Sequence, residues 1–172
     1  MSSEKKLFLI DAFAIIFRSY FAFGSNQRYN SKGLNTSVML GFTNTLLEIV
    51  NKEKPSHIAI CFDPQGKTFR EDIFPAYKAH RDETPEDIKK AIPYIFKLAE
   101  AFNIKSVVVP NYEADDVIGT LAKRAEKEGF TTYMMTPDKD FAQLVTDNIF
   151  LYRPAKSGNA AEVWGIKEVC AK

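Results

Sequence analysis

Acidic residues follow four apolar runs of this 172-residue chain, and this pattern constrains the fold more than any other feature. The runs KLFLI, HIAICF, SVVVPNY and TYMMTP each have the composition of a buried strand. The acids after them are Asp11, Asp63, Glu113, Asp115, Asp116, Asp138 and Asp140. The carboxyl ends of parallel strands share one edge of an open α/β sheet, so we expect these side chains to converge. Converging carboxylates raise one another's pKa, which makes a divalent-metal site the simplest interpretation.

Strand-like runs alternate along the chain with segments of helical length. Strands are expected at residues 5–10, 57–62, 106–109, 132–135 and 149–152. Helices are expected at residues 12–23, 38–50, 85–102, 113–128 and 141–145, with Thr84 as the N-cap of the third. This alternation specifies an α/β fold, a mostly parallel central sheet of about five strands flanked by helices.

The overall composition is that of an ordinary globular protein, with 45% hydrophobic and 26% charged residues. A single domain covering residues 1–172 is therefore expected. The first apolar stretch is short and is interrupted by Asp11, so we expect no signal peptide and no membrane span. A cytoplasmic location is therefore expected. The net charge of +1 argues against a strongly basic binding surface, although acids pooled at one edge would leave the rest of the surface basic.

The predicted ligands are all oxygen donors, which favours Mg²⁺ or Mn²⁺ over metals that prefer histidine or cysteine. Neither His57 nor His80 has a second ligand at a suitable spacing. Two such ions about 4 Å apart can activate water and stabilise both the attacking and the leaving oxygen of a phosphodiester. The acids therefore indicate phosphate chemistry.

The segment after the second expected strand, residues 64–83, is longer than most connections in compact domains. It alternates cations with aromatic residues: Lys67, Phe69, Arg70, Phe74, Tyr77, Lys78 and Arg81. Such side chains can pair with phosphate oxygens and stack on unpaired bases, so we expect this segment to bind nucleic acid. Thr36 and Ser37, at an expected helix start, could also take a backbone phosphate, although capping is the simpler role.

Each acid taken alone also has a simpler explanation, because aspartate is common in turns and acids are favoured in the first turn of a helix. The coincidence of acids at four successive strand ends, including the pairs E-x-D-D and D-x-D, is what favours a metal site.

Five segments cover nearly the whole chain with a more specific pattern. They are LFLIDAFAIIFRSYFA, GLNTSVMLGFTNTLL, CFDPQGKTFREDIFPAYKAHRDETPEDI, VPNYEADDVIGTLAKRAEKEG and TPDKDFAQLV. In this order they resemble the 5′ nuclease domains of bacterial DNA polymerase I, part of the flap endonuclease group. The resemblance implies a PIN-like, resolvase-like three-layer fold with a helical arch at about residues 64–90. It also implies a 5′–3′ exonuclease or 5′-flap endonuclease that removes primers and flaps in replication and repair.

The resemblance further implies roles for individual residues. One metal ion would be surrounded by Asp11, Asp63, Glu113 and Asp115, and the second or shared positions would be served by Asp116, Asp138 and Asp140. Lys78 and Arg81 would lie at the base of the arch and clamp the scissile phosphate, with Tyr77 and Arg70 nearby. The implied partners are DNA with a 5′ flap, nick or primer, and a polymerase domain in the same polypeptide.

The chain departs from the family pattern where it stops. Members continue into a segment with two further aspartates and a helix-hairpin-helix that binds duplex DNA, whereas this sequence ends at Lys172. We expect a weaker second metal and weak or absent nuclease activity from a fragment of this length.

Other functions remain open from the residues alone. A phosphotransferase could use Asp11 as its nucleophile, but Phe13 stands where a second acid would be expected. A non-catalytic DNA-binding module would use the acids only as caps and the basic segment for recognition. A PIN-like ribonuclease shares the acidic edge but lacks the long basic connection.

Overall fold

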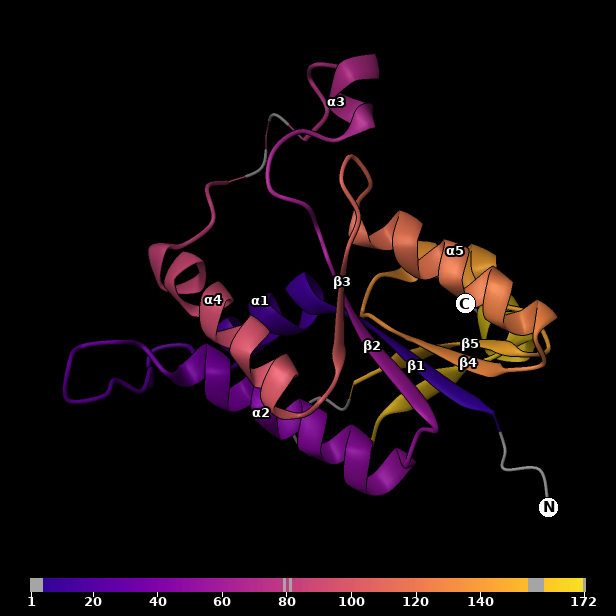
Figure 1. Cartoon of the computed structure of the whole chain (residues 1–172), viewed down its shortest axis with the longest axis horizontal. Coiled ribbons are helices and arrows are strands. Elements are labelled where there is room, and N and C mark those ends of the chain that lie inside the picture. Colours follow the sequence, from indigo (N-terminus) through magenta and orange to yellow (C-terminus); the bar gives the residue numbers. More distant parts are fainter. Residues whose placement is uncertain (1–4, 79, 81, 155–159, 172) are drawn as a thin grey trace.

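A six-stranded sheet forms the centre of the protein, described here by a computed structural model over residues 5–78, 80, 82–154 and 160–171 (Figure 1). Its strands are β1 (Lys6–Asp11), β2 (His57–Phe62), β3 (Lys105–Val108), β4 (Thr131–Met135), β5 (Ile149–Arg153) and β6 (Glu162–Trp164). The order across the sheet is β3-β2-β1-β4-β5-β6, and only β6 runs antiparallel to its neighbour. The predicted α/β class and mostly parallel sheet are confirmed.

Helices cover both faces of this sheet. They are α1 (Ala12–Ala22), α2 (Ser37–Glu48), α3 (Phe69–Ile73), α4 (Glu86–Ala101), α5 (Ala114–Lys127) and α6 (Ile166–Cys170), with a π-helical turn η1 (Ile49–Glu53) and a 3₁₀ helix η2 (Lys139–Leu144). One core joins α1, α2 and α4 to one side of the sheet, and a second core joins α5 to the other. Figure 1 shows the same division, which gives the three layers expected of the fold.

The central strands β1 and β4 are apolar because the helices bury them on both faces. Phe8 and Ile10 of β1 point into the first core, while Leu9 between them belongs to the second. A parallel strand buried on both faces reads as a continuous apolar run rather than an alternating one. The run KLFLI, which predicts a buried strand, forms β1 in the middle of the sheet.

Several element boundaries differ from the prediction. Helix α4 begins at Glu86 with Pro85 as its N-cap and no side-chain cap, so Thr84 does not cap it. The helix expected at 141–145 is the 3₁₀ helix η2, which begins two residues earlier. Strand β6 was not predicted, because a strand of three residues is too short to show a period.

The segment between β2 and α4 leaves the sheet at its carboxyl edge and carries the short helix α3 beyond it (Figure 1). The start of α3 is held by the Thr68 amide, which donates to the Glu71 carboxylate over 3.2 Å. Ile73 and Phe74 at its end are exposed. We call residues 64–85 the arch segment. No helix within the described part of the chain is long and apolar enough to cross a membrane.

Candidate metal centre

Acidic residues follow β1, β2, β3 and β4, which are neighbours in the sheet and run parallel. Their carboxyl ends therefore share one edge. From β1 the chain goes to β2 and β3 on one side and later reaches β4 on the other, so the order reverses between β1 and β4. Crevices that bind ligands form at such switch points.

Asp11 lies at this switch point, at the end of β1, and is only 9% exposed. Its Oδ1 atom accepts a hydrogen bond from the Ala14 amide over 3.0 Å and so caps α1. Its Oδ2 atom accepts one from the Thr136 hydroxyl, also over 3.0 Å, which ties the end of β1 to the residue after β4. Burial raises the pKa of Asp11, and the charges of Asp63 and Asp138 raise it further against these two hydrogen bonds.

Asp63 and Asp115 join the same group of charges from β2 and α5. The Asp63 carboxylate accepts a hydrogen bond of 2.7 Å from the Ala114 amide, which fixes the start of α5 beside the end of β2. Desolvation, followed by the charges of Asp11 and Asp63, raises the pKa of Asp115 to about 6. The charge of Asp138 acts on both Asp11 and Asp115. We call Asp11, Asp63, Asp115 and Asp138 the acidic cluster.

Glu113 and Asp116, at the start of α5, are paired with cations of the arch segment. Lys78 Nζ lies 2.8 Å from one Glu113 oxygen, and the Tyr77 hydroxyl donates to the other over 3.2 Å. Arg70 donates two hydrogen bonds of 2.6 and 2.7 Å to the Asp116 carboxylate. This pairing lowers the pKa of Asp116. Both carboxylates thus anchor the arch segment to α5.

Asp140 lies on η2, where its amide donates to the Asp138 carboxylate over 2.9 Å. It lines a groove of about 720 Å³ beside the acidic cluster. The groove is also lined by Glu113, Asp115 and Asp116 of the α5 start and by Arg70 and Tyr77 of the arch segment. Acids from separate segments and the predicted nucleic-acid contacts therefore border one space.

The acidic cluster fits a hard divalent cation in its donor chemistry. The charges of its members raise the pKa of Asp11 and of Asp115, and a bound ion would offset this repulsion. Within the described ranges, however, no three Asp, Glu, His or Cys side chains are already gathered tightly enough to hold an ion. Glu113 and Asp116 would have to turn from Lys78 and Arg70 before they could serve as ligands.

Three further predicted contacts, Thr36, Ser37 and Lys67, are not among the residues that line this groove. The Thr36 hydroxyl donates to the Arg28 carbonyl over 3.1 Å, and the Ser37 hydroxyl accepts from the Arg28 amide over 2.7 Å. Ser37 is fully buried, and both hydroxyls hold the α1–α2 loop, so a phosphate contact by these residues stays a prediction. Lys67 is exposed and makes no salt bridge with a described residue. Arg81 lies outside the described residues.

The protein family of this chain follows from its match to a known family. Residues 6–172 match the family described as "5'-3' exonuclease, N-terminal resolvase-like domain". The chain belongs to this family. The match spans both halves of the sheet, the arch segment and all seven acids.

Members of the 5′–3′ exonuclease family include curated proteins of much greater length. The chain is 40% identical over 147 residues to DNA polymerase I of Bacillus subtilis, covering 86% of this chain and 16% of that protein. It is 36% identical over 150 residues to a 5′–3′ exonuclease of Aquifex aeolicus, covering 87% of this chain and 51% of that protein. The chain thus spans about half of one relative and a sixth of the other.

Solved structures share the fold at low sequence identity. The T5 5′-exonuclease with bound zinc superposes with a TM-score of 0.71 at 15% identity, covering 96% of this chain and 60% of that one. The flap endonuclease of bacteriophage T5, in a pseudo-enzyme-product complex with DNA and metal ions, gives a TM-score of 0.69 at 15% identity with the same coverage.

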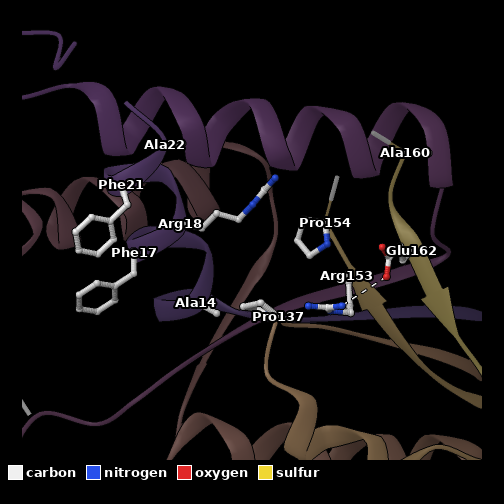
Figure 2. A pocket seen from close by; sticks show the side chains of 10 residues that line it. All are labelled: Ala14, Phe17, Arg18, Phe21, Ala22, Pro137, Arg153, Pro154, Ala160 and Glu162. Carbon is white, nitrogen blue, oxygen red and sulfur yellow. Dashed lines mark hydrogen bonds and ion pairs between the residues drawn. The ribbon is translucent and has the colours of Figure 1, made fainter. Parts of the chain in front are cut away.

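Two features of this exonuclease-family domain escaped the sequence analysis. Thr136 bridges to Asp11, a contact that depends on the pairing of β1 with β4. A second cavity, of about 660 Å³, lies between α1 and the segments that follow β4 and β5 (Figure 2). Phe17 and Arg18 line it from α1, opposite Pro137 and Arg153. One wall is α1 and the other comes from segments more than a hundred residues further along the chain, so no local sequence pattern indicates the cavity.

Proposed function

We propose that the protein is a divalent-metal-dependent 5′ nuclease that hydrolyses phosphodiester bonds of DNA. The observation that carries this proposal is the meeting of acids from four adjacent strand ends beside the cations of the arch segment. Family membership supports it, because the family is named for 5′–3′ exonuclease activity. Mg²⁺ or Mn²⁺ suits the all-oxygen donor set.

The acidic cluster would hold the metal, with Asp11 and Asp63 as its most fixed members. Hydrogen bonds from Ala14 and Thr136 orient Asp11, and one from Ala114 orients Asp63. Ligands fixed in this way lose little freedom on binding. Bound divalent ions would supply an activated water and neutralise charge on the reacting phosphate.

The arch cations would bind the substrate phosphate. Lys78 has a left-handed backbone conformation, with φ of 59°, and its ammonium group reaches back to Glu113. We expect Lys78 and Arg70 to exchange their carboxylate partners for phosphate oxygens when DNA binds. Tyr77 lies beside Lys78 and hydrogen-bonds to Glu113, and we expect it to contact the same strand. Arg81 is proposed for this clamp on the resemblance alone.

The proposed substrates are 5′ flaps, nicked duplexes and primer-containing duplexes. A similar fold carries DNA and metal ions in the T5 flap endonuclease complex, which supports a DNA substrate for this chain. We also propose that a polymerase domain belongs to the same polypeptide, because the B. subtilis relative is named DNA polymerase I. A cytoplasmic location is proposed as well.

The test is cleavage of a 5′-flap DNA duplex labelled at its 5′ end, in Mg²⁺ and in Mn²⁺. We expect slow release of short 5′ fragments that stops in EDTA. Asp63→Asn should lower the rate at least about 100-fold, because it removes a charge from the cluster while keeping the oxygen that accepts from Ala114. Asp147→Asn, on the exposed turn before β5, is the matched control and should cleave like the unaltered protein.

Cleavage that persists in EDTA, or that Asp63→Asn leaves unchanged, would overturn the proposal. Because weak or absent activity is expected from a fragment of this length, absence of cleavage overturns the proposal only if the protein also fails to bind Mn²⁺ at saturating concentration. An RNA flap of the same sequence serves as the comparison substrate, and faster cleavage of RNA would assign a ribonuclease instead.

A further inference from the structure

The groove beside the acidic cluster continues along α5, away from the carboxylates. Its lining includes Lys123, Arg124 and Lys127 of α5 in addition to the acids at the start of that helix. Residues 116, 120 and 124 are four positions apart, as are residues 123 and 127, and the two rows lie side by side on one face of the helix. From Asp116 to Lys127 this face is about 16 Å long at about 1.5 Å per residue.

The two ends of the groove differ in charge. Glu113, Asp115 and Asp116 lie at the amino end of α5, and the three cations lie at its carboxyl end. Arg124 and Lys127 are exposed and form no salt bridge or side-chain hydrogen bond with any residue in the described ranges. Lys123 donates to the Leu144 carbonyl over 3.2 Å, which fixes it against η2.

Neighbouring acids form no ion pair with Arg124 or Lys127 among the described residues. Glu126 accepts a hydrogen bond from the Thr146 hydroxyl and lies 3.9 Å from Lys123, at the limit of an ion pair. Arg124 and Lys127 therefore keep their full charge at the mouth of a groove whose other end is the proposed metal centre. Such a gradient suits a polyanion with one phosphate at the proposed metal centre and the next phosphates at the cations.

The lining of the groove favours one strand over two. Tyr77, an aromatic side chain of the kind that stacks on unpaired bases, lines its acidic end. A single strand carries a phosphate about every 3.4 Å when stacked, so several phosphates fit along the α5 face. Arg70 and Tyr77 of the arch segment line the same groove at its acidic end, which makes the path continuous with the arch.

We infer that the α5 face formed by Lys123, Arg124 and Lys127 binds the phosphate backbone of single-stranded DNA next to the reacting phosphate. The inference rests on the proposed nuclease function for the identity of this ligand. It assigns to α5 a role separate from metal binding, namely to guide the unpaired strand past the carboxylates.

Helix electrostatics offers the competing explanation. Cations in the last turn of a helix stabilise it through the helix dipole, whether or not anything binds them. That role predicts a loss of thermal stability on their removal and no change in DNA binding. The two roles are therefore separable by measuring both quantities on the same variants.

The test measures binding of fluorescein-labelled oligo-dT by anisotropy between about 20 and about 200 mM NaCl, in EDTA so that neither metal nor chemistry is needed. The double variant Arg124→Gln with Lys127→Gln should reduce the slope of log K against log salt by about 1.4, at about 0.7 for each lost phosphate contact. Lys97→Gln with Lys105→Gln makes the same charge change away from the groove and is the matched control. Arg124→Lys with Lys127→Arg keeps both charges and should keep the slope.

A slope that falls no further in the groove variant than in the control overturns the inference, as does an unaltered protein that does not bind oligo-dT at all. A groove variant that melts earlier but keeps its slope assigns the helix-dipole role and also overturns it. If the groove variant is too unstable to measure, the single variant Arg124→Gln decides the same question. Its slope of log K against log salt should be smaller by about 0.7 than that of the unaltered protein, and an unchanged slope overturns the inference. Failure of the unaltered protein both to cleave flaps and to bind Mn²⁺ would overturn the proposed function while leaving this binding result intact.

Discussion

At the scale of single residues, burial and mutual repulsion make the ionised carboxylates of the acidic cluster unfavourable in the folded protein. The raised pKa of Asp115, about 6, means that the folded state favours its protonated form relative to the unfolded chain. The contribution of this pKa shift to the free energy of unfolding is fully present below about pH 4 and is lost as the pH rises through about 6. Stability in EDTA should therefore fall between these pH values.

Asp115→Asn should remove this loss, because the amide carries no charge that burial would desolvate or that Asp11 and Asp63 would repel. We expect the variant in EDTA at about pH 7.5 to be more stable than the unaltered protein by about 1 kcal/mol, a value discounted for the partial exposure of Asp115. Urea unfolding at about pH 4 and about pH 7.5 measures the difference. Asp147→Asn is the control for net charge, and a less stable Asp115→Asn protein at the higher pH would show that the cluster is not under strain.

The sequence predicted where these acids lie but not how they are paired. A strand end fixes the position of Asp11 or Asp63, because strands and their order follow from apolar runs. The partners of Glu113 and Asp116 come from the arch segment, 35 and 46 residues away, and their geometry depends on how that segment folds back. No local pattern contains that information.

At the scale of elements, close packing of α1 on α2 depends on the absence of a side chain at Gly41. A Cβ atom at this position would lie 2.7 Å from the Ser19 Cβ atom, which is closer than real contacts allow. Gly41→Ala should therefore destabilise the protein by about 1–3 kcal/mol despite its better helix propensity. Thermal unfolding measures this cost.

Gly119→Ala is the matched control in α5. A Cβ atom there meets only the end of the flexible Leu144 side chain, at 3.1 Å, so the change should be neutral or stabilising by up to about 1 kcal/mol. Ser19→Gly in the Gly41→Ala background should restore part of the loss. Equal effects of the two alanine substitutions would show that the α1–α2 contact is looser than described.

The arch segment is a second element whose order can be tested. Arg70 joins it to α5 through two charge-assisted hydrogen bonds to Asp116, with 29% of the Arg70 side chain exposed. Arg70→Gln should increase amide hydrogen exchange in α3 about tenfold in EDTA, because a bond of this kind contributes about 1.5 kcal/mol or more. Arg28→Gln, on the exposed α1–α2 loop, should leave exchange in α3 unchanged. Unaltered exchange in both variants would mean that other contacts hold the arch segment.

Sheet and helices were predictable at this scale because their signals are local. Apolar runs indicated five of the six strands, and the alternation with helices indicated the parallel sheet. The errors fall where tertiary contacts decide, at the three-residue strand β6 and at the start of α4. The helix α3 also lay hidden in a segment without a regular period.

At the scale of the whole molecule, metal binding and folding should be coupled. An ion that binds only the folded state stabilises it by mass action, by about 2.7 kcal/mol at a concentration about 100 times its dissociation constant. We therefore expect Mn²⁺ to raise the melting temperature and EDTA to reverse the rise. Asp63→Asn should abolish most of the shift, and a shift that this variant retains in full would place the bound ion elsewhere.

The most direct measurement of the central claim is the anomalous scattering of Mn²⁺ in crystals of this protein. We predict at least one strong peak in direct contact with the carboxylates of Asp11, Asp63 and Asp115, at the carboxyl edge of β1 and β2. With saturating Mn²⁺, an edge without any peak, or ions bound only elsewhere on the surface, would contradict the account.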